Sequence, residues 1–326
     1  MGLNMKFLIL FLLFYPISYT LAETTFEGDI EADWDHVTTS DKPNEVVYTF
    51  SHKLGGNGTF ALLSETTKDD FFAKAKLQTK LNFDGTVAPE DVFMIFGKTD
   101  TWDITIGHFE ALELFAEGES VVFSVAESGN INKVNDVRGR AAGAVMPRIY
   151  FGDLSFQINM LTKEAEHAGE PTNYKGLRPA IEYTSGPLSV ALGVESVEEK
   201  AQKRGVDYYH HLQNLGVKIK FDKEQYFVGL SLGSRHVTGD VDETHDNSVG
   251  LIAFYKGLGP GNLGFGGFSN NHENKSEKKK ITTQVQYLSY AMPLLTDKSS
   301  LKIGLNNSKA DEKTTQNVRL RFTYTL

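Results

Sequence analysis

Apolar and polar residues alternate along most of this chain, from about residue 24 to the last residue. The final ten residues, NVRLRFTYTL, place one set of side chains on each side of an extended strand: Val318, Leu320, Phe322, Tyr324 and Leu326 against Asn317, Arg319, Arg321, Thr323 and Thr325. The same period of two recurs in FFAKAKLQTKLNF at 71 to 83 and in residues 153 to 162. Helical spacing is almost absent. The pattern predicts an all-β protein whose strands have one apolar and one wet face.

The candidate strands fall into two groups along the chain. Counted back from the C-terminus, the first group is 316–326, 299–307, 280–291, 262–269, 247–256, 225–236, 207–221, 188–196, 177–184, 153–162 and 139–151. A long connection from about 109 to 137 precedes it, and before that lie 101–108, 91–98 and 71–83, with strand-like pieces at 24–35, 45–53 and 58–66. An antiparallel barrel with both ends on one side needs an even number of strands. We therefore expect sixteen, with one piece merging into a neighbour or a loop, and fourteen or eighteen as alternatives.

The connections between these strands are of two kinds. Short ones include 152–153, 185–187 and 222–224, whereas long polar ones are expected at 162–176, 236–247 and 270–280. Such alternation of short and long connections is typical of an up-and-down transmembrane barrel, whose short turns face the periplasm.

A soluble β-sandwich is the alternative fold. Its strands usually span ~5 to 6 residues, whereas several alternations here persist over about nine to thirteen, the length that a tilted strand needs to cross a bilayer. Aromatic residues near strand ends share the apolar side and suit interfacial girdles. They are Trp34, Trp102, Tyr183, Tyr226, Tyr255, Tyr287, Phe322 and Tyr324. These features favour a transmembrane barrel over a sandwich.

The N-terminus has the order of a secretory signal peptide. Lys6 precedes the apolar run FLILFLLFYPI, and small residues follow up to Ala22. The apolar run is too short for a spanning anchor, which needs ~20 residues. We expect residues 1–22 to be a cleaved signal peptide and residues 23–326 to be the barrel. The chain has no cysteine, which excludes a disulfide-stapled exported scaffold.

Charge and motifs exclude several function classes. The formal net charge is -9, and the longest basic tract is Lys278-Lys279-Lys280, so nucleic acid is not an expected partner. There is no cysteine nucleophile and no G-x-S-x-G motif, so no catalytic residue is assigned. No cofactor and no metal site are predicted, although His236 and His245 at a barrel rim leave a protease- or phospholipase-type enzyme open.

The signal peptide, the meander of about 300 residues, the amphipathic last strand and one long loop resemble the trimeric outer-membrane porins of Gram-negative bacteria. The stretch TIGHFEALELFAEGESV, followed by NDVRGRAAG, is similar to the glycoporins related to the raffinose porin. The resemblance implies a homotrimer in outer-membrane lipid that passes small hydrophilic solutes, sugars in particular, by diffusion. The chain departs from porins in ending on Leu326 rather than on Phe or Trp.

The resemblance also implies which residues shape the pore. The long third loop, about Phe109 to Val137, would fold into the lumen with Glu110, Glu113, Glu117 and Glu119. Side chains of lumen parity would form a basic wall opposite it: Lys74, Lys76, Lys80, Arg138, Arg140, Arg148, Arg319 and Arg321. Carboxylates facing a basic wall would set a transverse field across the constriction. Phe72, Phe109, Phe115 and Tyr150 are candidate sugar contacts. A non-selective general porin is the alternative.

Overall fold

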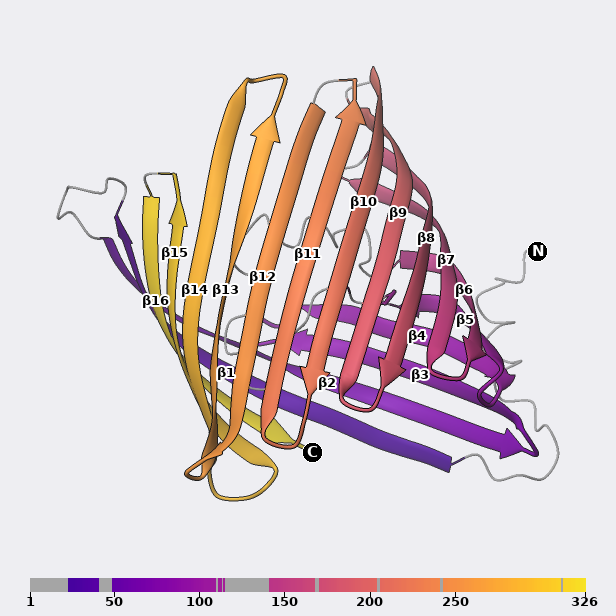
Figure 1. The fold of residues 1–326 in the computed structure, drawn as a ribbon, viewed down its shortest axis with the longest axis horizontal. Helices are drawn as coiled ribbons and strands as arrows, with labels where there is room; N and C mark the ends of the chain where they lie inside the picture. The colour runs from indigo at the N-terminus through magenta and orange to yellow at the C-terminus, as the bar shows by residue number, and fades with distance from the viewer. Residues whose placement is uncertain are drawn as a thin grey trace.

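The chain folds as a single closed antiparallel β-barrel in a computed structural model (Figure 1). The structure describes residues 23–40, 49–109, 111–112, 114, 141–167, 170–203, 206–240, 243–311 and 313–326. They form β1 (Glu23–Ser40), β2 (Thr49–Lys68), β3 (Phe71–Asn82), β4 (Val87–Lys98), β5 (Trp102–Phe109), β6 (Ala141–Phe151), β7 (Leu154–His167), β8 (Glu170–Ser185), β9 (Leu188–Lys203), β10 (Val206–Asp222), β11 (Tyr226–Gly239), β12 (Glu243–Leu258), β13 (Gly261–Asn274), β14 (Lys279–Pro293), β15 (Ser299–Ala310) and β16 (Lys313–Thr325). Each strand pairs with its sequence neighbours, and β1 pairs with β16. The predicted all-β barrel of sixteen strands is confirmed.

The strand count is resolved within β2. Residues 49–53 of the predicted piece 45–53, and all of the piece 58–66, are parts of this one strand, which continues through Gly55-Gly56-Asn57-Gly58; residues 45–48 lie outside the described residues. Gly56 has a φ of 150°, and a Cβ there would lie 2.3 Å from the carbonyl oxygen of Glu31 on β1. Only glycine fits this position, so a sequence that reads as a turn remains inside the sheet.

The predicted long polar connections at 162–176, 236–247 and 270–280 are wrong. Strands β7 and β8 extend to His167 and from Glu170, and β11 to β14 likewise run through most of the other two segments. The strands therefore continue well beyond their alternating portions. Where both faces of a strand contact water, no apolar side remains, so the period-two signal disappears although the hydrogen-bond ladder continues.

The outer surface carries an apolar belt, which we define as the outward large apolar side chains of all strands. On β9 these are Leu188, Val190, Leu192 and Val194, and the outward series then turns polar at Ser196. On β16 the belt runs from Tyr324 to Val318 and ends at Gln316. Seven to nine residues at ~3.3 Å each, tilted by ~35 to 45°, correspond to a height of about 16 to 24 Å. Leu192, at 44% exposure, is one of many exposed large apolar side chains on this surface, and a contiguous apolar surface of this extent indicates a protein or membrane contact.

Charged and polar side chains face the interior instead. Asp35, Asn159, Arg178, Glu195, Asn270 and Arg319 are all at most 8% exposed. Tyr287, predicted to face outward, belongs to this interior set, because Leu288 beside it is 46% exposed and Tyr287 only 6%. The sequence VQYLS has apolar residues on both sides, and pairing of β14 with β13 and β15 decides which side faces in.

Aromatic residues mark mainly one edge of the belt. We call the end of the barrel at which Leu326 lies the C-terminal end and the opposite end the far end. Outward aromatics close to the turns of the C-terminal end include Tyr183, Phe221, Tyr226, Tyr255 and Tyr324. At the far-end edge of β9 to β16, serine, glutamine, asparagine and histidine occupy the outward positions instead. The predicted aromatic girdle is thus present at one edge of these strands.

The expected signal peptide, residues 1–22, lies outside the described residues. Among the residues that are described, none forms a helix of the length and apolarity that a membrane span requires.

A charge placed on the belt tests its orientation. Replacing Leu192 by Arg should lower the free energy of unfolding in lipid vesicles by about 2 to 4 kcal/mol, because midplane positions of such barrels tolerate Arg poorly. Thr162→Arg, an outward exposed position near the far-end edge of β7, should cost at most about 1 kcal/mol. Urea titration followed by gel mobility measures both. Equal costs at the two positions would contradict the belt.

Candidate functional site

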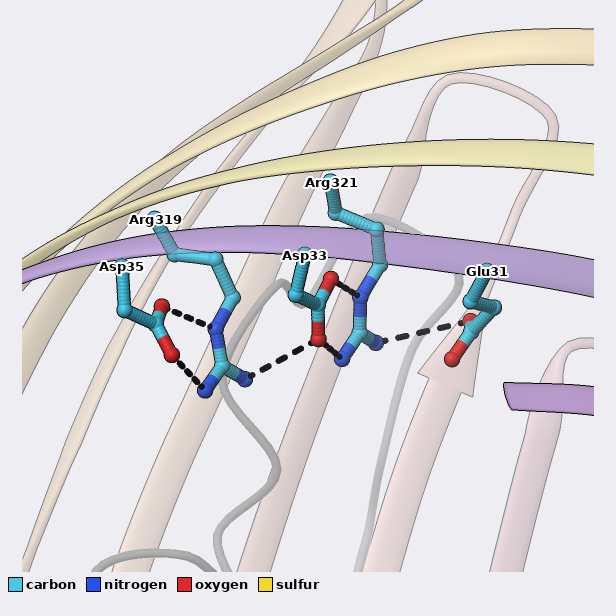
Figure 2. Close-up of polar contacts among 5 residues, drawn as sticks. All are labelled: Glu31, Asp33, Asp35, Arg319 and Arg321. Atoms are coloured by element: carbon cyan, nitrogen blue, oxygen red, sulfur yellow. Dashed lines mark hydrogen bonds and ion pairs between the residues drawn. The ribbon is translucent and has the colours of Figure 1, made fainter. Parts of the chain in front are cut away.

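A ladder of five charged residues lines the interior where β1 meets β16, and we call it the seam ladder. The register pairs Asp33 with Arg321 and Asp35 with Arg319. Figure 2 shows carboxylates and guanidinium groups alternating along it, from Glu31 through Arg321, Asp33 and Arg319 to Asp35. The first and last strands are thereby joined by side chains as well as by backbone hydrogen bonds.

Each arginine of the seam ladder binds one aspartate with two hydrogen bonds. Arg319 donates from Nε and Nη2 to Asp35 at 2.7 and 3.0 Å, and Arg321 donates from the same atoms to Asp33 at 2.7 and 2.8 Å. Longer contacts link Arg321 to Glu31 at 3.4 Å and Arg319 to Asp33 at 3.9 Å. Bidentate pairs of this kind are the stronger form of the arginine–carboxylate interaction. The charges of the two arginines are therefore largely compensated.

The three predicted lysines of β3 also face the interior. Lys76 donates to Asp91 of β4 at 2.8 Å. Lys74 Nζ lies 2.9 Å from a carboxylate oxygen of Glu65 on β2, and the side chains of Lys74 and Glu65 are each about half exposed. Lys80 lies opposite Thr59 in the register of β2 and β3. The structure thus places the predicted basic side chains on the wall and adds acidic partners that sequence reasoning missed.

Arg148 and Tyr150 of β6 meet a shared carboxylate. Tyr150 donates its hydroxyl to Asp103 of β5 at 2.6 Å, and Arg148 Nε lies 3.6 Å from the other oxygen of Asp103. The guanidinium carbon of Arg148 is 5.7 Å from the centroid of the Tyr150 ring. Phe72, the other predicted aromatic on the wall, has the ammonium of Lys74 at 5.6 Å from its ring centroid. Both rings are partly exposed beside charged groups.

Phe109 does not present its ring to the lumen. It is 3% exposed and packs with Phe93, Ala144 and Met146, where its ring meets that of Phe93 edge-on at 6.1 Å. The predicted loop carboxylates Glu110, Glu113, Glu117 and Glu119 lie outside the described residues, as do Phe115, Arg138 and Arg140. Their predicted positions therefore stay predictions.

One described residue of the segment after β5 reaches the wall of another strand. Leu114 is 4% exposed, and a Cβ built on Gly216 of β10 would lie 2.6 Å from its Cδ1 atom. Gly216 belongs to the inward series of β10, because Leu215 next to it is exposed on the outside. The chain directly after β5 therefore contacts the inner face of a strand five positions away along the sheet.

A second buried polar group spans β8, β9 and β10 and was missed from sequence. Arg178 Nε lies 3.6 Å from Glu195, and Asn214 donates to the other Glu195 oxygen at 2.8 Å. Further round the barrel, His272 Nδ1 is 2.8 Å from Asp246. These residues lie on the polar side of their strands, but only the register brings them together.

Three histidines near the far end, His211, His236 and His245, have the outward parity of their strands. His236 Nε2 is 3.3 Å from Glu243, and the rings of His236 and His245 are 5.9 Å apart. Glu243 also accepts a hydrogen bond from Lys275 in the turn between β13 and β14, which raises the pKa of that lysine. Ser196 and His211 are in contact at 3.0 Å. No carboxylate of the described residues bonds to His211. Within the same residues no group of three or more His, Asp and Glu could hold a metal ion.

Known structures share this architecture. OmpT of Vibrio cholerae in its trimer form matches with a TM-score of 0.70 at 11% identity, over 94% of this chain and 100% of that one. The anion-selective porin of Comamonas acidovorans matches at 0.69 and 12% identity over 94% and 100%, and Salmonella typhi OmpF in complex with daunomycin at 0.68 and 12% over 92% and 97%. The fold is that of an outer-membrane porin. No family model and no curated protein sequence matches the chain.

The seam ladder is testable by a double-mutant cycle. Arg319→Leu leaves the buried carboxylate of Asp35 without its bidentate partner and should cost about 3 to 5 kcal/mol of unfolding free energy in lipid vesicles. Adding Asp35→Leu should restore much of this, because the pair is removed together. Strictly additive losses in the double variant would show that the two side chains do not interact.

Proposed function

We propose that the protein is a channel in the outer membrane of a Gram-negative bacterium, through which small hydrophilic solutes diffuse passively. The observation that carries this is that the barrel wall is apolar on its outside and polar on its inside, the reverse of a soluble protein. Large apolar side chains such as Leu192 are exposed outside, whereas the Arg319–Asp35 pair faces inward. A closed sheet with this polarity suits a lipid exterior and a wet interior. On this placement the C-terminal end faces the periplasm.

Sugars are the proposed solute class. Phe72 and Tyr150 are partly exposed on the inner wall beside Lys74 and Asp103, so apolar ring faces lie next to hydrogen-bonding groups. Pyranose rings offer the same combination of apolar faces and hydroxyl edges. Phe109 is a weaker candidate, because its ring is covered. A non-selective general porin is the alternative, and the same wall supports it.

The protein is proposed to work as a homotrimer, in line with the trimer form named for OmpT. It is not proposed to be an enzyme. A phospholipase- or protease-type barrel would need a serine whose histidine is oriented by a third group. The Ser196–His211 contact has no such bond from a carboxylate of the described residues, and His236 binds Glu243 instead.

Conductance across a planar lipid bilayer tests the proposal. Purified protein should form ohmic channels, and linear oligosaccharides should interrupt the current at concentrations at which a charged amino acid does not. Absence of channels would overturn the porin assignment. If the channels conduct but no sugar of a graded series perturbs the current, the result supports a non-selective general porin and contradicts the sugar preference.

The Leu114–Gly216 contact gives a prediction about the constriction. Gly216→Val should displace Leu114 and the segment that follows it, because even a Cβ at this position lies 2.6 Å from the leucine. If this segment narrows the lumen, single-channel conductance should change by roughly 1.5-fold or more. Gly233→Val, at the inward glycine paired with Gly216 on β11, is the matched control. Identical conductance of wild type and both variants would contradict the role of the contact.

A further inference from the structure

Two grooves cross the far-end edge of the apolar belt on the outside of the barrel. The first groove, of about 570 Å³, runs over β7 to β11, with Leu177, Val194 and Leu215 on its apolar side and Ser196, Gln213 and Ser234 on its polar side. The second groove, of about 470 Å³, runs over β14 to β16. Its apolar side has Leu288, Leu305 and Val318, and its polar side has Gln286, Asn307 and Gln316.

The two grooves share one design although they lie on different parts of the wall. In each, the apolar lining belongs to the belt, and the polar lining is the next outward row toward the far end. Gln213 and Gln286 are exposed on this outer face, so their amide groups point away from the polar side chains of the interior. An occupant must therefore be amphipathic, with its apolar part toward the middle of the belt.

The polar linings indicate the kind of headgroup. They consist of amides and hydroxyls, with His236 at the end of the first groove, and their outward side chains include no Lys, Arg, Asp or Glu. Carboxamides both donate and accept hydrogen bonds, as do the hydroxyls of a sugar. A choline headgroup has no N–H or O–H to donate. No outward Trp, Tyr or Phe, the residues that usually anchor a belt edge, lines either groove; Tyr287, which also borders the second groove, is on the inward face of β14.

We propose that each groove seats one glycolipid of the surrounding leaflet. Its acyl chain lies against the leucine and valine side chains, and its sugar headgroup hydrogen-bonds to Gln213 and Ser234 in the first groove and to Gln286, Asn307 and Gln316 in the second. This inference rests on the membrane placement of the proposed function, but not on any solute that the channel passes.

Lipid retention tests the proposal directly. The full protein is inserted into nanodiscs that contain equal amounts of a diglucosyl diacylglycerol and a phosphatidylcholine with identical acyl chains, and native mass spectrometry counts the lipids that remain bound after transfer to detergent. Wild type should retain up to two molecules of the glycolipid and several-fold less phosphatidylcholine. Gln213→Leu and Gln286→Leu should each lower glycolipid retention roughly twofold, and the double variant should bring it to the phosphatidylcholine level.

Gln284→Leu is the matched control, because Gln284 is exposed on the same outer face of β14 but lines neither groove. It should retain as much glycolipid as wild type. Equal retention of the two lipids by wild type, or the same loss in Gln284→Leu as in Gln286→Leu, overturns the inference. Channel conductance of the same samples separates the two proposals, because a failed glycolipid site leaves it unchanged.

Discussion

A β-sheet in lipid must have no open edge, and in this chain that requirement is met where the first strand pairs with the last. Arg319 and Asp35 are 284 residues apart in sequence, yet their side chains share two hydrogen bonds. A shift of the pairing by one residue would turn these charges to the outside of the barrel and the belt residues to its interior. The seam ladder and the apolar belt therefore favour the same register, and closure of the barrel fixes both.

The interior charges are arranged mainly as local pairs. Arg319 and Arg321 lie between the carboxylates of β1, Lys76 binds Asp91, and Arg148 shares Asp103 with Tyr150. On the proposed function, such a wall would offer solutes alternating charges and dipoles at short range rather than one uniform basic surface. The transverse field expected between a basic wall and acidic loop then depends on how the carboxylates of residues 109–137 combine with pairs that are already compensated.

The fold could be predicted from the sequence because the belt imposes strict alternation, as in the last ten residues. The same reasoning failed where its physical basis ended. Beyond the belt both strand faces are wet, so the outer parts of β7 and β8 read as loops, and in β14 two apolar sides put Tyr287 on the wrong face. The alternation predicted that Arg319 and Arg321 face the lumen, and Asp33 and Asp35 lie on the polar side of β1 in the same way. Their pairing depends on register, which period two alone does not specify.

Accessibility of single cysteines along β3 tests the central claim, that one strand face is wet and the other is not, and the chain has no native cysteine to interfere. In lipid vesicles, cysteine at positions 74, 76, 78 and 80 should react with a charged, water-soluble thiol reagent, whereas cysteine at 73, 75 and 77 should stay unmodified. Reaction with a period of two would support a water-filled barrel with a lipid-facing exterior. Uniform reaction, or uniform protection, along the strand would contradict it.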